Sequence, residues 1–260
     1  MKNKLLISTS LPQLSQIIES QKQQLIKATS KYCNIDLVGA MKDVIMPRNP
    51  LGINNPNALK TFTDIFCKHF KQQTNQNEVQ SGCLIDNRFD FGSRTERFLI
   101  NKAKKRFKSL MNGLDYIGFV TFSAYKNTYL NLDDGLLRSV HLHFILIGEQ
   151  KIPRSKRKQI RELAICNDEA CIPLKIVKYP LNQAVEYAWK SPIFMGYSSV
   201  YDPNKDKVSN LRSRPSLKQL YKYYQLFRGV DIDHWTIAGG KGKKIWHSIK
   251  KELLAIKEAE

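Results

Sequence analysis

The chain has 260 residues, enough for a substantial hydrophobic core, and its 42% hydrophobic content excludes a mainly disordered protein. It carries 42 Lys+Arg against 23 Asp+Glu, which gives a formal net charge of +19. An excess of this size predicts a polyanionic partner. Nucleic acid is the first choice, and an anionic membrane surface is the competing one.

Membrane and disulfide-rich classes are disfavoured. No stretch reaches the roughly 18 consecutive apolar residues of a membrane span, and the apolar run after Met1 is too short for a signal peptide. We therefore expect a cytoplasmic protein with no membrane partner. The cysteines are odd in number and form no C-x-x-C motif, so neither a disulfide framework nor a structural zinc site is expected. Buried free thiols are predicted instead for Cys33, Cys67, Cys83, Cys166 and Cys171.

Residues 1–90 are predicted to form a helical N-terminal region. Apolar residues recur at helical spacing from Leu11 to Ala28 and again from Ala58 to Gln73. Between these two ranges, Pro, Gly and Asn dominate residues 46–57, which predicts a loop. We expect this region either to recognise duplex DNA or to pack on the rest of the chain.

Residues 91–200 mix strand and helix patterns. Runs of β-branched, aliphatic and aromatic residues predict strands at 116–125, 139–148 and 172–179. Helical spacing predicts helices at 95–110, 153–165 and 180–190. No helix separates the first two strands, so we expect them to pair antiparallel. This pattern predicts an α+β fold with a central antiparallel sheet and flanking helices, rather than a doubly wound α/β fold.

Basic residues gather in three runs. Residues 101–110 hold five Lys/Arg, residues 151–161 hold six, and residues 241–251 hold five. One such run is typical of a solvated helix face, but three in a strongly basic chain favour phosphate contacts. The range 201–260 is expected to be a mainly helical C-terminal extension that is basic and rich in aromatic residues. Its helix at 216–228 interleaves aromatic rings with cations, which suits either single-stranded nucleic acid or ordinary packing.

Two histidines lie in the strand predicted at 139–148. Side chains alternate across a strand, so His141 and His143 share one face. Two imidazoles held in this way suit a divalent metal, although each is also compatible with a structural role. If the preceding connection folds back as a hairpin, Asp133 or Asp134 supplies a third ligand, while turn chemistry is the alternative. Two histidines and a carboxylate with open positions suit Mn²⁺ or Mg²⁺ acting on a phosphate.

A candidate nucleophile lies in the helix predicted at 180–190. Tyr187 and Lys190 are three residues apart and share a helix face. A nearby cation and a metal that polarises a phosphate would both favour attack by a tyrosine. The alternative is a tyrosine that packs its ring and exposes its hydroxyl.

Three segments occur in a fixed order: the apolar strand Phe119-Val120-Thr121-Phe122-Ser123, then His141-Leu142-His143, then Tyr187-Ala188-Trp189-Lys190. This order resembles the three motifs of the HUH endonucleases, and specifically the rolling-circle replication initiators (Rep proteins) of plasmids with one catalytic tyrosine. The resemblance covers about residues 115–191. A weaker likeness to the same branch lies in Thr236-Ile237-Ala238-Gly239-Gly240.

The resemblance implies an HUH-type nuclease core at 91–200 that nicks and rejoins single-stranded or hairpin origin DNA through a covalent 5′-phosphotyrosine. It assigns His141 and His143 as metal ligands, Tyr187 as the nucleophile and Lys190 as the cation beside it, and Asp134 is our candidate third ligand. The ion would be Mn²⁺ or Mg²⁺, and the host replication machinery would be a partner. The chain departs from the family in that we expect no upstream histidine to complete a three-histidine cluster, so the third ligand stays open.

Two other functions fit the same pattern. A transposase or relaxase would use the same chemistry in a different biological role. A non-catalytic nucleic-acid-binding protein would keep the charge and the aromatic residues, while the histidines and Tyr187 would be structural. The discriminating feature is the position of Tyr187. Its hydroxyl must face the two imidazoles across one basic cleft if the chain is an enzyme, and burial of Tyr187 on the far side of the sheet would exclude the enzyme.

Overall fold

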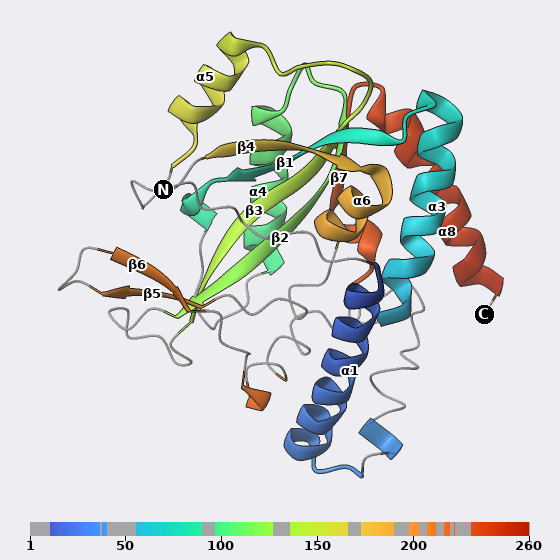
Figure 1. Cartoon of the computed structure of the whole chain (residues 1–260), viewed down its shortest axis with the longest axis vertical. Helices are drawn as coiled ribbons and strands as arrows, with labels where there is room; N and C mark the ends of the chain where they lie inside the picture. The colour runs from blue at the N-terminus through green and yellow to red at the C-terminus, as the bar shows by residue number, and fades with distance from the viewer. Residues whose placement is uncertain are drawn as a thin grey trace.

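The computed structural model describes residues 11–36, 38–40, 56–89, 97–126, 136–165, 173–189, 198–202, 207–211, 216–218, 221 and 230–259. These residues form an α+β fold, in which helices cover a five-stranded sheet whose neighbouring strands all run antiparallel. Figure 1 shows α6 in front of this sheet and α4 behind it. The expected fold class is therefore confirmed.

The sheet has the strand order β4-β1-β3-β2-β7. Its strands are β1 (Glu78–Ile85), β2 (Tyr116–Lys126), β3 (Leu136–Leu146), β4 (Leu174–Pro180) and β7 (Thr236–Gly239). The three strands expected from the sequence correspond to β2, β3 and β4. The expected antiparallel pairing of the first two is confirmed by the β2–β3 ladder, which runs from Tyr116 opposite Leu146 to Lys126 opposite Leu136.

Two strands of the sheet were not expected from the sequence. The first, β1, lies within the range predicted to be helical and pairs with both β3 and β4. It is rich in small and polar residues, among them Gln80, Ser81 and Gly82, so it lacks the apolar pattern of a buried strand. The second, β7, has only four residues and pairs with β2. The sheet thus takes strands from all three ranges into which the sequence divides.

Five helices agree closely with those expected from the sequence: α1 (Leu11–Cys33), α3 (Pro56–Thr74), α4 (Arg97–Leu110), α5 (Arg154–Leu163) and α6 (Leu181–Trp189). A further helix, α8 (Gly242–Ala259), had no separate prediction and lies in the C-terminal extension that was expected to be mainly helical. Short 3-10 turns lie at η1 (Asn87–Phe89) and η3 (Ile232–Trp235). A separate hairpin joins β5 (Ser198–Asp202) and β6 (Lys207–Leu211). None of the described helices has the length and apolar character needed to cross a membrane.

An aromatic cluster fixes α6 against the sheet. The ring of Trp189 lies 5.3 Å from Phe62 and 5.1 Å from Phe66 of α3, and 6.1 Å from Phe119 of β2, between centroids. Trp189 is 1% exposed, and its indole N–H donates to the Thr236 hydroxyl at 3.0 Å. Buried rings of α3 and β2 and a hydrogen bond from Trp189 therefore fix the orientation of α6 on the sheet.

A buried ion-pair network joins η1, α4 and α5 beyond the end of β1. Asp86 is fully buried and contacts Arg88 at 2.8 Å and Arg106 at 3.5 Å. The same two guanidinium groups each donate to the Leu163 carbonyl at the end of α5. Burial of a carboxylate is tolerated here because two cations and hydrogen bonds compensate it. The network ties α5 to the side of the sheet that carries α4.

The cysteine predictions are partly wrong. Cys33 is exposed and its thiol donates to the Tyr221 hydroxyl, while Cys67 and Cys83 are half-buried. All three are free thiols, as expected. Cys166 and Cys171 lie outside the described residues, and so does most of the helix expected at 216–228.

Candidate metal and tyrosine site

His141 and His143 lie on the middle strand of the sheet, β3. The two side chains are 6% and 5% exposed, and they project from the same face of the strand, as the alternation predicts. The apolar residues Val140, Leu142 and Phe144 occupy the opposite face and are fully buried. The alternating pattern of β3 therefore forces both imidazoles into one layer, the one that also holds α6.

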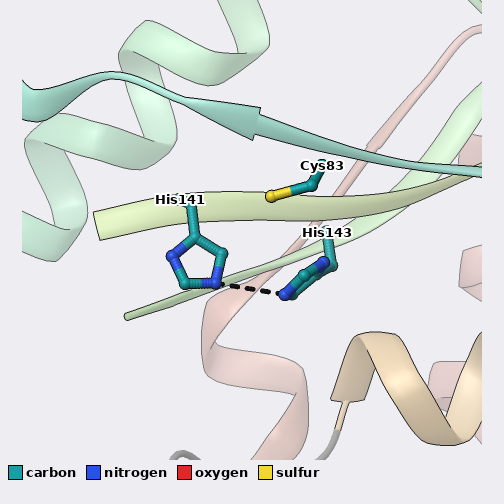
Figure 2. Close-up of side chains that lie close together, drawn as sticks. All are labelled: Cys83, His141 and His143. Carbon is teal, nitrogen blue, oxygen red and sulfur yellow. Dashed lines mark hydrogen bonds between the residues drawn. The ribbon is translucent and has the colours of Figure 1, made fainter. Parts of the chain in front are cut away.

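The two imidazoles point their Nε2 atoms at each other. These atoms are 3.1 Å apart, and the rings meet edge to face with centroids 4.7 Å apart (Figure 2). Two nitrogen ligands bound to one ion at about 2.1 Å, with an angle of about 90–109° between them, are about 3.0–3.4 Å apart. The observed separation also fits one N–H···N hydrogen bond. The pair is thus already spaced as metal ligands, and one shared proton would hold it in that position.

Cys83 brings a third donor to the imidazoles. It lies directly opposite His143 in the β1–β3 ladder, and Figure 2 shows it beside the two rings. Its sulfur and one nitrogen of each imidazole all lie within 4.8 Å of one another, and the three residues form a group that could hold a metal ion. Cys83 was not expected as a metal ligand, because no spacing motif in the sequence links it to the histidines. Its role depends on β1, a strand that was not expected.

Tyr187 faces the histidines from α6. Its ring lies edge-on to His143 with centroids 4.8 Å apart, and it stacks on Tyr179 of β4 at 6.4 Å. The tyrosine is half-buried, so it lies at the margin of the site rather than inside the core. The arrangement that the enzyme hypothesis requires, with Tyr187 on the same side of the sheet as the imidazoles, is the one observed.

Polar groups on both sides of the histidines share their face of the sheet. Thr121 of β2 lies directly opposite His141, and its buried hydroxyl makes no hydrogen bond with any described residue. Lys175 of β4 lies opposite Cys83 and is exposed. Because paired residues of a ladder lie on the same face, these side chains add a hydroxyl and a cation near the imidazoles. Neither residue was singled out from the sequence.

Three of the predicted site residues lie outside the described part of the chain. Asp133 and the candidate third ligand Asp134 belong to the connection between β2 and β3, and Lys190 directly follows α6. The structure therefore brings together His141, His143 and Tyr187 of the predicted set.

Glu186 belongs to a different environment from its neighbour Tyr187. Its pKa is raised by burial and, to a lesser degree, by the charge of Asp64 on α3. Cys67 of α3 lies near the same carboxylates, and burial raises the pKa of its thiol to about 11. Successive helix residues point about 100° apart. Glu186 thus faces α3, while Tyr187 faces the sheet, and this carboxylate is poorly placed to act as a base at the histidines.

Comparison of the chain with protein-family models, with curated proteins and with solved structures finds no match.

Proposed function

We propose that this protein is a plasmid rolling-circle replication initiator of the HUH type, a metal-dependent endonuclease and strand transferase acting on single-stranded origin DNA. The observation that carries the proposal is the contact between the Tyr187 and His143 rings, 4.8 Å apart, beside paired imidazole nitrogens 3.1 Å apart. A nucleophile next to a metal-binding pair is what phosphoryl transfer to a tyrosine needs. The order and spacing of the three motifs and the net charge of +19 add support.

In the proposed reaction the Tyr187 hydroxyl oxygen attacks the scissile phosphorus and loses its proton to water. The bond from phosphorus to the 3′ oxygen breaks, and the leaving oxygen takes up a proton to become a 3′-hydroxyl. The 5′ phosphate stays esterified to Tyr187. One ester is exchanged for another, so a later attack by a 3′-hydroxyl on the phosphotyrosine rejoins the strand and releases the tyrosine.

A divalent ion held by His141 and His143 would polarise the phosphate and stabilise the charge that develops on it. Mn²⁺ or Mg²⁺ is proposed, with Asp134 or water completing an oxygen-rich ligand set. Thr121, opposite His141 on β2, has a buried hydroxyl that would be available to hydrogen-bond a water ligand of the ion. Lys190, directly after α6, is the proposed cation beside the tyrosine, and Lys175 is a second candidate from β4.

The experiment is incubation of the full chain with a single-stranded origin oligonucleotide and Mn²⁺, followed by a denaturing gel. Wild type is expected to form a covalent DNA adduct, and Tyr187→Phe to reduce it at least 100-fold, because the variant lacks the attacking oxygen. Tyr179→Phe is the matched control, since the Tyr179 ring stacks on the Tyr187 ring but belongs to β4. The control should retain the adduct.

The outcomes separate the competing functions. An adduct that survives Tyr187→Phe and is lost in Tyr179→Phe would overturn the assignment of the nucleophile. Binding of the oligonucleotide with no adduct in any metal would favour the non-catalytic nucleic-acid-binding protein. A transposase or relaxase would form the same adduct but would act on transposon ends or a transfer origin, so a panel of these substrates distinguishes it from a replication initiator.

A further inference from the structure

The two helices on the far side of the sheet from Tyr187 are unusually basic. The sequence of α4 contains six Lys/Arg and no acidic residue, and that of α5 contains five Lys/Arg and one acidic residue, Glu162. Arg106 and Arg88 join these helices through the Leu163 carbonyl, so the two form one continuous region. Charge of one sign at this density repels itself and is typical of a surface that meets a polyanion.

Cations on α5 form an exposed stripe. Ile160 is the buried residue of this helix, and Arg154, Lys158 and Arg161 follow one another at intervals of four and three residues on an exposed side. From the first to the last, the stripe spans about 10 Å along the helix axis, which is the axial rise of about three base pairs of duplex DNA. The length of the stripe therefore suits contacts to successive phosphates.

Some cations of this region bind other groups of the chain and are therefore not available to an outside anion. Arg106 neutralises Asp86, Arg157 donates to the Ile152 carbonyl, and Lys104 donates to the His234 carbonyl, where burial lowers its pKa. The rest include four exposed cations that make no ion pair with any described residue. These four are Lys105 on α4, Arg154 and Arg161 on α5, and Lys151 just before α5. We call them the α4–α5 cations.

The described side chains of this surface include none of the exposed aromatic rings on which single-stranded bases stack. Among the described side chains of α4 and α5, the aromatic one is Phe107, which is fully buried. Proteins that hold single strands combine cations with exposed rings, whereas duplex backbones are bound by cations alone. Exposed charge without rings thus favours a duplex partner.

We propose that the α4–α5 cations dock double-stranded DNA through its phosphates, on the opposite side of the sheet from Tyr187. This surface is separate from the single-strand site of the proposed function, and it binds DNA whether or not Tyr187 cleaves it. A protein with both surfaces holds the duplex beside an origin while the single strand reaches the tyrosine.

The test compares two variants of the full chain that each remove four positive charges. The first is Lys105→Ala, Lys151→Ala, Arg154→Ala and Arg161→Ala. The control is Lys241→Ala, Lys243→Ala, Lys244→Ala and Lys251→Ala, which removes exposed lysines in and just before α8. Binding of a random-sequence duplex and of a single-stranded oligonucleotide is measured over a range of salt concentrations.

Each lost phosphate contact lowers the slope of log affinity against log salt by about 0.9 for duplex DNA. For the first variant, the duplex slope is expected to be smaller in magnitude by up to about 3.6, because four contacts are lost. The affinity of this variant for the single strand should be mostly retained. The control should keep the duplex slope. Equal losses in both variants, or no loss in the first, would overturn the proposal. Unchanged duplex binding together with lost binding to phosphatidylserine vesicles would instead identify this surface as a membrane-binding one.

Discussion

His143 contacts both parts of the candidate site, because its Nε2 faces His141 and its ring meets Tyr187. The alternation of β3 predicts that the two histidines share a face, and the sequence was sufficient for that step. Cys83 could not be predicted in the same way. A thiol 58 residues before His141 becomes its neighbour only through strand pairing, which no local spacing encodes.

The Cys83 sulfur bears on which metal the site selects. A thiolate favours Zn²⁺ or Co²⁺, whereas a set of histidines and oxygens leaves Mn²⁺ suitable. We predict that Co²⁺ bound to wild type gives a near-ultraviolet charge-transfer band from sulfur to metal. Cys83→Ser should lack this band and should bind Co²⁺ at least about 10-fold more weakly. Absorbance titration measures both. Cys67→Ser is the control, because this thiol on α3 is grouped with carboxylates rather than with the histidines.

A wild-type Co²⁺ complex without this band would remove Cys83 from the ligand set and leave an oxygen ligand such as Asp134 in its place. That result would strengthen the assignment of Mn²⁺ or Mg²⁺ to the nicking reaction, because both ions prefer oxygen ligands.

At the scale of elements, α6 is the part that positions the nucleophile. It is a helix of nine residues, short for independent stability, so its place depends on packing. Trp189 supplies that packing from two residues beyond Tyr187. The sequence predicts the helix and its inward face, but the partners of Trp189 come from α3, β2 and β7, which only the folded chain brings together.

Trp189→Ala is expected to destabilise the protein by about 3–5 kcal/mol, because a large buried ring is removed and a cavity is left among other rings. The same variant, assayed below its unfolding temperature, should lose adduct formation as α6 shifts. Urea unfolding measures the first effect. Leu254→Ala, at an exposed apolar residue on α8, is the control and should change stability by less than about 0.5 kcal/mol. A stability close to wild type for Trp189→Ala would contradict the role given to this ring.

The contact between α3 and α6 carries an unfavourable charge. Burial and Asp64 raise the pKa of Glu186 above that of the unfolded chain, so stability falls as pH rises through the raised pKa and the carboxylate ionises. Glu186→Gln removes this cost and is expected to raise the unfolding temperature near neutral pH by a small amount. The gain should disappear below the unfolded pKa of 4.5, where the carboxyl is protonated in both states. A lower unfolding temperature at neutral pH would mean that the carboxylate makes a favourable contact instead.

At the scale of the whole molecule, the sheet gathers strands from distant parts of the sequence. The β2–β3 hairpin and β4 follow local patterns, and these were sufficient to predict an α+β fold. The inner strand β1 carries Ser81 and Gly82 where a buried strand usually has aliphatic residues, since Phe144 fills the space above Gly82. Burial of β1 is thus a consequence of its neighbours, and local sequence could not reveal it.

The charge of the molecule also has a spatial order that composition hides. The net charge of +19 predicts an anionic partner, but not which face meets it. In the folded chain the described site with Tyr187 lies on the side of the sheet that carries α6, and the α4–α5 cations belong to helices that Arg106 joins to each other. This separation is the reason why we propose two DNA-binding surfaces rather than one evenly basic surface.

Tyr187 is proposed as the nucleophile that attacks the phosphorus, and mass spectrometry of the DNA adduct tests this assignment directly. Trypsin releases residues 179–190 as one peptide that carries both Tyr179 and Tyr187, and fragment ions tell the two apart. After nuclease digestion of the bound strand, we predict a 5′-nucleotide remnant on Tyr187. A remnant on Tyr179, or on any residue outside this peptide, would contradict the account.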